Sequence, residues 1–346
     1  MRVNIIYNKI PHHAGRSGYD QILRHLQQRI DVDNLPGDIP RFVPMWAMEW
    51  VASQASMEWY SAWSVALEGA AARRLLSHRG ELCHALYGEN DYRFLGSIAP
   101  LLRRRGARLV CSYHQPPALF EKVAPPRKVL RQLDAVVAVA SNQADYFSSM
   151  LGEDRVFVVP HGIDTTVYTP ATHANGRRFE CLFVGQWLRD FEVLAGVVER
   201  VRAAEPEIVF TVVTDPGNAE RLERLDGVQA RSGVSDDELL ALYRRASLFV
   251  LPLTDCTANN ALLEALACGL PIVTTDVGGV RDYVDESCAV VTPAGEADAM
   301  AEAVLELATD APRLAAMAVC SRERALDYDW PAVADRIVGV YREVGS

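Results

Sequence analysis

The sequence predicts an α/β protein with two domains, each built from a parallel β-sheet wrapped by helices. Short runs of β-branched and aliphatic residues alternate along the chain with longer stretches of helical spacing, and this alternation favours parallel sheets. The 346 residues are more than a single hydrophobic core usually holds, so we expect two cores. A content of 49% hydrophobic and 23% charged residues is ordinary for a globular protein.

The first domain is expected over residues 1–160. Its strands are predicted at residues 2–7, 108–112 and 135–140, where short apolar runs are bounded by polar or turn residues. Residues 156–159 then lead into Pro160-His161-Gly162-Ile163-Asp164, which indicates the hinge into the second domain.

The second domain is expected over residues 161–327. Its strands are predicted at 179–184, 208–214, 248–251 and 272–275, each followed by a loop and in most cases by a helix. Beyond it, Val333, Ile337, Val340 and Tyr341 recur at helical spacing, so residues 328–346 predict a final helix.

The segment from Asn259 to Thr275 has the pattern of a capped helix, a sharp stop and a buried strand. An Asn at the helix start and Gly269 at its end are the usual signals for these boundaries. Glu264 interrupts this otherwise apolar helix. A buried carboxylate needs hydrogen-bond donors, and the two hydroxyls of a ribose are suitable donors. The alternative is a Glu264 that faces solvent.

This segment resembles the donor-site motif of family 4 glycosyltransferases, which are retaining enzymes of the GT-B fold. The family motif has two glutamates eight positions apart, of which the second matches Glu264 and the first matches Cys256. The resemblance implies two Rossmann-like domains that face a cleft, with the last helix packed back on the first domain. It also implies that the position of Cys256 lies near the transferred sugar, so the replacement concerns the sugar more than the nucleotide. Asp255 is the alternative group for that role.

Two loops are candidates for binding the donor's diphosphate. The loop at residues 11–20 has two glycines without the Gly-x-Gly-x-x-Gly spacing, which disfavours a nicotinamide cofactor. We expect Ser17 and Gly18 to offer backbone N–H groups to the diphosphate or sugar, and a simple turn is the alternative.

The second candidate loop follows the strand at 179–184. In the resembled family an Arg follows the Gly and a Lys stands six positions beyond that Gly. Here Gln186 follows Gly185, and Phe191 takes the place of the Lys. Arg189 is the cation of this loop, so we expect it to bind phosphate oxygens, with a surface ion pair to a nearby acidic residue as the alternative.

His114 directly follows a predicted buried strand, where open α/β sheets place their chemistry. It resembles the family's active-site histidine, which contacts the transferred sugar. A purely structural histidine is the alternative. Glu89 is expected to be a solvated loop carboxylate unless it lines the acceptor side.

Residues 45–67 hold four of the six tryptophans, Trp46, Trp50, Trp59 and Trp63. We expect a helix that packs in the first domain, either as core or as the wall of an aromatic acceptor pocket. The acidic residues in this stretch disfavour an anionic membrane, so membrane contact is expected to be at most peripheral.

Other classes of function are disfavoured by composition. A net charge of −10 without a basic stripe disfavours nucleic acid. The chain has no apolar run as long as a membrane span and begins with a predicted strand, so we expect a cytoplasmic protein. Its seven cysteines contain no Cys-x-x-Cys, and neither Asp-x-Asp sequence (Asp31–Asp33, Asp327–Asp329) ends a nucleotide-binding strand. We therefore expect no structural zinc and no metal at the phosphates.

The resemblance implies a retaining, hexosyl-type glycosyltransferase of the EC 2.4 class. It would move a sugar from a nucleoside diphosphate, UDP- or GDP-linked, to a hydroxyl of a small-molecule or glycan acceptor such as a natural product, glycolipid or surface glycan, without a bound cofactor. The catalytic candidates are His114 for the sugar, Arg189 for the diphosphate and Glu264 for the ribose. Further donor-binding candidates are Ser17, Gly18, Gly185, Gln186, Cys256, Thr257, Ala258, Asn259 and Asn260.

Retention without a protein nucleophile suggests that the departing phosphate oxygen takes the acceptor's proton on the same face of the sugar. Stabilising this leaving group would then carry most of the catalysis. Two other classes stay open. They are a sugar-nucleotide epimerase of the same build and a catalytically silent partner that binds nucleotide sugar.

Overall fold

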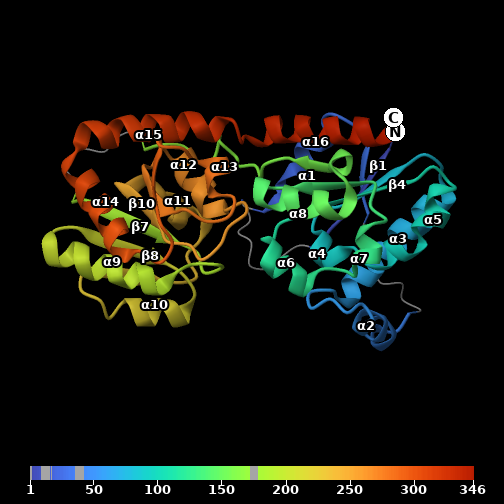
Figure 1. Cartoon of the computed structure of the whole chain (residues 1–346), viewed down its shortest axis with the longest axis horizontal. Helices are drawn as coiled ribbons and strands as arrows, with labels where there is room; N and C mark the ends of the chain where they lie inside the picture. Colours follow the sequence, from blue (N-terminus) through green and yellow to red (C-terminus); the bar gives the residue numbers. More distant parts are fainter. Residues whose placement is uncertain (1, 9–15, 17, 36–42, 172–177) are drawn as a thin grey trace. The chain divides into compact units, whose positions relative to one another are not determined.

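The computed structural model describes residues 2–8, 16, 18–35, 43–171 and 178–346, and the chain divides into two compact units (Figure 1). Unit 1 holds the described residues up to His161, apart from a short piece within 14–17, together with residues 330–346. Unit 2 holds residues 162–329 and that short piece. The chain therefore starts in unit 1, builds unit 2 and ends in unit 1.

Unit 1 contains a six-stranded parallel sheet in the order β2-β1-β3-β4-β5-β6. The chain places β2 on one side of β1 and β3 on the other, so the strand order reverses between β1 and β3. Open α/β sheets bind ligands beyond the carboxyl ends of their strands at such a point. The strands are β1 (Val3–Ile6), β2 (Val32–Asn34), β3 (Leu82–Ala85), β4 (Arg108–Tyr113), β5 (Ala135–Ala138) and β6 (Val156–Val158).

Helices cover this sheet with apolar side chains such as Leu75, Leu102 and Phe147. The buried Glu68 accepts the backbone N–H groups of residues 93–95 at distances up to 2.9 Å and so satisfies the first turn of α5. The helices are η1 (Tyr19–Gln21), α1 (Ile22–Leu26), α2 (Met45–Ser53), α3 (Ala62–Ser77), α4 (Gly88–Asp91), α5 (Phe94–Arg103), α6 (Pro117–Val123), α7 (Arg127–Leu130), α8 (Ser141–Leu151), η2 (Glu153–Arg155) and α16 (Trp330–Gly345).

The last helix, α16, packs in unit 1 through the apolar residues whose spacing predicted it. Val333, Ile337 and Val340 are buried. The hydroxyl of Tyr341 lies 2.6 Å from Nδ1 of His84, and the guanidinium of Arg29 bonds the carboxylate of Asp335 at the helix surface. A buried apolar face and a buried polar contact together fix this helix against the sheet and α1.

Unit 2 contains a second six-stranded parallel sheet, in the order β12-β11-β10-β7-β8-β9. Here the chain runs outward from β7 in one direction and from β10 in the other, so the order reverses between β7 and β10. The strands are β7 (Glu180–Val184), β8 (Val209–Val213), β9 (Val228–Arg231), β10 (Leu248–Leu251), β11 (Ile272–Thr275) and β12 (Ala289–Thr292).

The core of unit 2 packs helices on this sheet through residues such as Val197, Val201, Phe210, Val250 and Val304. The helices are α9 (Phe191–Ala204), α10 (Pro216–Leu222), α11 (Asp236–Arg245), α12 (Asn260–Ala267), α13 (Val280–Tyr283), α14 (Ala297–Thr309) and α15 (Ala311–Leu326). None of the helices in the described part of the chain combines the length and hydropathy that a membrane-spanning helix requires.

Five strands were not expected from the sequence. β2, β6, β9 and β12 lie at sheet edges and are partly exposed. β2 (Val-Asp-Asn) and β9 (Val-Gln-Ala-Arg) lack a continuous apolar run, and residues 156–159 were expected only as the approach to the hinge. β3 lies in the middle of its sheet and is fully buried, but it reads Leu-Cys-His-Ala and contains no β-branched residue. Its histidine, His84, forms hydrogen bonds with Ser112 on β4 and Tyr341 on α16. These partners are distant in sequence, so no local pattern predicts them.

The single helix expected over residues 45–67 is wrong. α2 ends at Ser53, the chain adopts a left-handed conformation at Ser56 (φ 56°), and α3 starts after Ser61, whose hydroxyl caps the new helix. Core packing is also wrong for Trp46, Trp50 and Trp63, which are 70%, 64% and 52% exposed.

Candidate functional site

The capped helix predicted at residues 259–267 is present as α12. The side chain of Asn259 accepts the N–H of Leu262 at 3.2 Å, and Gly269 ends the helix with a φ of +70°. Every residue from Ala261 to Ala267 is buried. The predicted Asn cap and the predicted stop at Gly269 are therefore both confirmed.

Glu264 is 3% exposed, so the solvent-facing alternative is wrong. The hydroxyl of Tyr168 donates to Oε1 at 3.2 Å, and the hydroxyl of Tyr243, which donates to the carbonyl of Ala261 at 3.4 Å, lies close to the same carboxyl group. Burial, only partly offset by these two hydroxyls, raises the pKa of Glu264 to about 7. A carboxylate offers about four acceptor positions, so two phenols leave room for two further donors.

The loops that follow β7 and β10 are joined to each other at the carboxyl edge of the sheet. The N–H of Asp190 donates to the carbonyl of Pro252 at 3.0 Å, and the N–H of Thr254 donates to the carbonyl of Leu188 at 3.1 Å. These bonds hold residues 185–190 beside residues 252–259, at the point where the strand order reverses.

Arg189 lies between these two loops, and Gly185 makes room for it. Gly185 has a φ of +108°, and a Cβ there would lie 2.5 Å from Nη2 of Arg189. The guanidinium donates to the carbonyls of Val184 at 3.1 Å and Trp187 at 2.8 Å and to Oδ1 of Asn259 at 3.2 Å. Desolvation lowers the pKa of Arg189 to about 10, so the group is still charged at neutral pH.

Among the described residues, no carboxylate forms an ion pair with Arg189, so the surface-pair alternative is wrong. Its neighbour Glu192 instead pairs with Arg221 at 2.6 Å. Because Asn259 accepts from Arg189 and also caps α12, it holds the guanidinium at the positive end of that helix. Two positive groups are thus held together, and the positive potential there favours an anion.

Residues 256–260 continue this edge. Cys256, Thr257 and Asn259 are buried, whereas Ala258 and Asn260 are partly exposed. Gln186 is exposed on the neighbouring loop. Unit 2 therefore brings together the predicted donor-binding residues Gly185, Gln186, Arg189, Cys256, Thr257, Ala258, Asn259, Asn260 and Glu264 at and beside one end of its sheet.

In unit 1, His114 directly follows β4 and is enclosed by side chains that the sequence did not single out for this role. Its backbone N–H donates to Oε1 of Glu89 at 2.8 Å. The rings of Tyr19 and Tyr87 have their centroids 4.8 and 5.0 Å from the imidazole centroid. Glu89 is 2% exposed, so the expected solvated carboxylate is wrong.

The glycine-containing loop of unit 1 is described only in part. Ser17 lies outside the described residues, and Gly18 has a φ of +115° directly before η1. A residue in that conformation is strained unless it is glycine, which agrees with a turn and leaves the predicted phosphate contact a prediction.

Two models of protein families match the chain. The model "Glycosyl transferases group 1" matches residues 178–310, which contain the predicted donor-binding residues of unit 2. The model "Glycosyltransferase Family 4" matches residues 50–167, which lie mainly in unit 1. Together with the two parallel sheets, these matches decide the fold class. The chain has the GT-B fold. The Rossmann-like architecture expected from the sequence is confirmed.

Curated proteins that are similar to this chain agree with the family models. A D-inositol 3-phosphate glycosyltransferase of Stackebrandtia nassauensis is 31% identical over 65% of this chain and 57% of its own length. A GDP-mannose-dependent alpha-(1-6)-phosphatidylinositol monomannoside mannosyltransferase of Mycolicibacterium smegmatis is 28% identical over 68% of this chain and 70% of its own. The chain thus spans between about half and three quarters of the curated relatives it matches.

Solved structures share the fold at low identity. Sucrose-phosphate synthase from Thermosynechococcus elongatus has a TM-score of 0.72 at 17% identity over 99% of this chain and 98% of its own. Anabaena HepE in complex with UDP has a TM-score of 0.70 at 14% identity over 99% of both chains. These neighbours confirm the GT-B fold.

Cys256, which was predicted to match the first glutamate of the resembled family's motif, is tightly packed. The thiol of Cys256 donates to the carbonyl of Thr257 at 3.0 Å, and burial raises its pKa to about 12. A Cβ on Gly278 would lie 2.0 Å from the carbonyl oxygen of Cys256. A neutral thiol is a poor nucleophile, which argues against covalent catalysis by this residue. Asp255 bonds the N–H of Cys256 at 2.7 Å and is thus engaged within its own loop.

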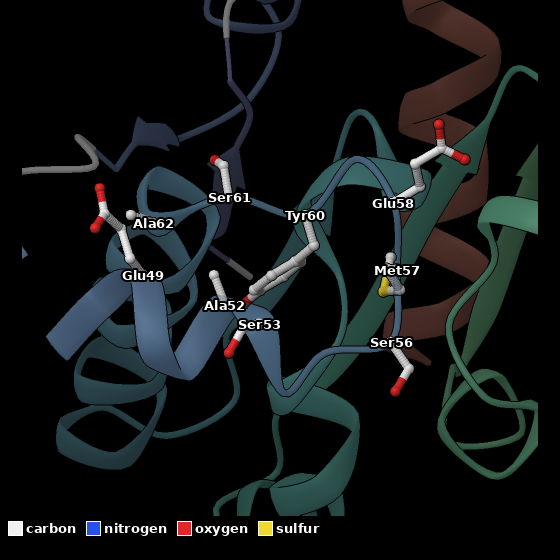
Figure 2. Close-up of a pocket in the computed structure, with 9 residues that line it drawn as sticks. All are labelled: Glu49, Ala52, Ser53, Ser56, Met57, Glu58, Tyr60, Ser61 and Ala62. Carbon is white, nitrogen blue, oxygen red and sulfur yellow. The ribbon is translucent and has the colours of Figure 1, made fainter. Parts of the chain in front are cut away.

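Unit 1 also has an open cavity of about 560 Å³ between α2 and the start of α3 (Figure 2). Its lining is mostly polar and includes Glu49, Glu58 and Tyr60, but the hydroxyl of Tyr60 is already engaged by the buried Glu68. The exposed Trp46, Trp50 and Trp63 belong to the same two helices.

The Asp-x-Asp sequences have structural partners. Asp33 lies in β2 and pairs with Arg2 at 2.9 Å, and Asp329 accepts the N–H of Thr165 at 3.2 Å. In the part of the chain that the structure describes, no group of three or more His, Cys, Asp or Glu side chains is placed to hold a metal ion.

Proposed function

We propose that the protein transfers a sugar from a nucleoside-diphosphate donor to a hydroxyl group of an acceptor, with retention of configuration. The observation that carries this proposal is the guanidinium of Arg189, held by Asn259 at the start of α12 without a carboxylate partner among the described residues. Such a pair of positive groups suits a diphosphate.

The ribose of the donor would bind next to this diphosphate site. Glu264 lies on the second turn of α12, four residues after Asn260, and its carboxylate has acceptor positions beyond those used by Tyr168 and Tyr243. The 2′- and 3′-hydroxyls of a ribose are donors of the matching kind. A GDP-mannose-dependent relative and a UDP-bound structural neighbour support UDP or GDP as the nucleotide.

In the reaction, Arg189 and the N–H groups at the start of α12 would stabilise the charge that develops on the departing phosphate. His114 would orient the hydroxyls of the transferred sugar. Charge stabilisation of the leaving group is a large term in catalysis when the site excludes water, and no metal or bound cofactor is needed for it. The acceptor is a small molecule, a glycolipid or a glycan. Membrane contact is at most peripheral, and the cytoplasm is the expected compartment.

A two-stage experiment tests this function. Thermal unfolding is first recorded with UDP, GDP, ADP and TDP, and one of these at saturating concentration is expected to raise the midpoint because it binds only the folded state. The matching nucleotide sugars are then incubated with simple alcohol and sugar acceptors, and release of the diphosphate together with an α- or β-configured product is followed by NMR.

The outcomes separate the candidate functions. Transfer with the anomeric configuration of the donor supports the proposal, and an inverted product would overturn the retaining part. Conversion of the nucleotide sugar without any acceptor would indicate the epimerase, and binding without turnover would indicate a silent partner. Neither of these alternatives is favoured by the relatives.

A further inference from the structure

A buried carboxylate sits against His114, and the proposed function gives it no role. Glu89 lies in the first turn of α4, directly beyond β3, and is 2% exposed. Its Oε1 atom accepts the backbone N–H of His114 at 2.8 Å and lies 3.7 Å from Nδ1 of the same residue. Among the described residues, Oε2 has no hydrogen-bond partner at all.

A carboxylate in this situation is costly to the fold. Buried carboxyl groups are normally paired with a cation or fully hydrogen-bonded. In Glu89, the Oε2 atom has no hydrogen-bond partner among the described residues. In the described part of the chain, the imidazole of His114 is the one basic side chain within 4.0 Å of it. A neutral side chain at position 89 would avoid this cost in folding free energy. The carboxyl group of Glu89 is therefore best explained by an effect on the imidazole of His114.

The imidazole is also fixed from both sides. The ring of Tyr19 meets it edge-on, with an interplanar angle of 68°, and the ring of Tyr87 lies against it at 42°. The two tyrosines are tied together, because the N–H of Tyr19 donates to the hydroxyl of Tyr87 at 3.0 Å. The ring of His114 therefore has little freedom to turn.

The tyrosine walls are in turn anchored in the body of unit 1. Ser112 lies 3.3 Å from the hydroxyl of Tyr19 and 2.8 Å from Nε2 of His84, and Nδ1 of His84 lies 2.6 Å from the hydroxyl of Tyr341. All four side chains are buried. This chain of hydrogen bonds connects β3, β4, η1 and α16 behind the imidazole.

We propose that Glu89 is a positioning residue for His114. Its carboxylate accepts the backbone N–H of His114 just beyond β4 and lies 3.7 Å from Nδ1, so that it favours an imidazole proton on Nδ1 and the ring presents a fixed tautomer to the sugar. This step rests on the proposed function, in which His114 orients the hydroxyls of the transferred sugar. Partners that fix a histidine's tautomer in this way have large effects on catalysis elsewhere.

The first test is independent of activity. The ¹⁵N shifts of the imidazole nitrogens of His114 are measured in the full-length protein and in Glu89→Gln, with His114→Ala used to assign the signal. The amide oxygen of Gln can still accept the backbone N–H of His114, so this variant keeps that contact and loses the charge. We expect the Nδ1–H tautomer to dominate in the wild type and to lose population in the variant. Equal tautomer populations in both proteins would overturn the proposal.

The second test uses turnover of the nucleotide sugar. Glu89→Gln is expected to lower kcat roughly tenfold to a hundredfold while KM for the donor stays within about twofold, because the residue acts on orientation and not on affinity. The matched control is Glu153→Gln, an exposed carboxylate in η2, which should leave kcat unchanged.

The two residues are finally combined. If Glu89 acts through His114, Glu89→Gln should lower kcat only slightly in a protein that already carries His114→Ala. If Glu89→Gln lowers kcat by the same factor in the wild type and in His114→Ala, Glu89 does not act through His114. Glu89→Asp keeps the charge and should recover part of kcat. If the wild type transfers no sugar, the proposed function fails, whereas the NMR result still decides the positioning role.

Discussion

Glu264 is a buried residue of the candidate site whose charge state changes near neutral pH. Burial raises its pKa to about 7 from an ordinary value of 4.5. Between these two values the unfolded chain loses the proton while the folded chain keeps it, so the free energy of unfolding falls as pH rises. Above pH 7 the free energy of unfolding has fallen by about 3 kcal/mol in total, because each unit of pKa difference corresponds to about 1.4 kcal/mol.

We therefore predict that Glu264→Gln, which cannot titrate, gains stability relative to the wild type as pH rises. Urea unfolding at pH 4.5 and pH 8 measures this, and the difference between the two proteins should be larger by about 3 kcal/mol at pH 8. A difference that is the same at both pH values would show that the carboxyl group titrates normally.

Glu264 should also determine nucleotide affinity. Removing the carboxylate in Glu264→Ala is expected to weaken the binding of nucleoside diphosphates about tenfold to a hundredfold. Hydrogen bonds to a charged group contribute about 1.5–3 kcal/mol. Calorimetry measures this directly, with Glu199→Ala on the exposed face of α9 as the control. An unchanged dissociation constant would remove the ribose assignment.

Arg189 is expected to distinguish the diphosphate from the nucleoside. Arg189→Lys should weaken the binding of UDP or GDP by roughly tenfold, because an ammonium group cannot bond two phosphate oxygens at once as the planar guanidinium does. The affinity for the bare nucleoside should not change. Arg221→Lys, whose guanidinium pairs with Glu192 at the surface, is the matched control. Equal losses for nucleotide and nucleoside would indicate a folding effect.

At the scale of elements, the start of α12 has two tasks that one side chain performs. Asn259 caps the helix and anchors the guanidinium of Arg189. Asn259→Ala should cost about 1 kcal/mol of stability through the lost cap and should also weaken nucleotide binding.

A second cap in unit 2 provides the comparison. Ser235 accepts the N–H of Glu238 at the start of α11, so Ser235→Ala should cost a similar stability without affecting nucleotide affinity. Chemical denaturation and calorimetry on both variants separate the two tasks. If the two variants lose affinity equally, the anchoring role of Asn259 is excluded.

The elements also show what a sequence can reveal. α12, β10 and β11 were predicted within a residue because their signals are local, namely a capping Asn, a terminal Gly and short apolar runs. β3 was missed because its His84 is satisfied by Ser112 and Tyr341, which are distant in sequence. The break between α2 and α3 was missed because the apolar pattern continues through it.

The candidate site shows the same limit. Local motifs and the family resemblance identified Arg189, Glu264 and His114 as candidates, and the structure gives each a buried or enclosed setting. The side chains that create these settings, such as Tyr168 beside Glu264 and Glu89 beside His114, come from other segments. Their own sequence surroundings carry no signal, since contacts between distant segments are set only by the folded topology.

At the scale of the whole molecule, the assignment of α16 to unit 1 has a measurable consequence. Tyr341→Phe removes the hydroxyl that bonds His84 and leaves a buried imidazole nitrogen without that partner. We predict a loss of about 1–3 kcal/mol in the unfolding of the protein, with little change in nucleotide affinity, since Tyr341 and the residues of α12 belong to different units. Differential scanning calorimetry with and without nucleotide measures both quantities.

This arrangement also sets the order in which the protein matures on the ribosome. The main segment of unit 2, residues 162–329, precedes α16 in the sequence, so it can fold during translation while unit 1 still lacks that helix. A nascent chain that stalls before α16 has emerged would therefore carry a folded unit 2 next to an incomplete unit 1. Proteolytic removal of α16 would damage the unit that holds His114, although that residue lies far from α16 in the sequence.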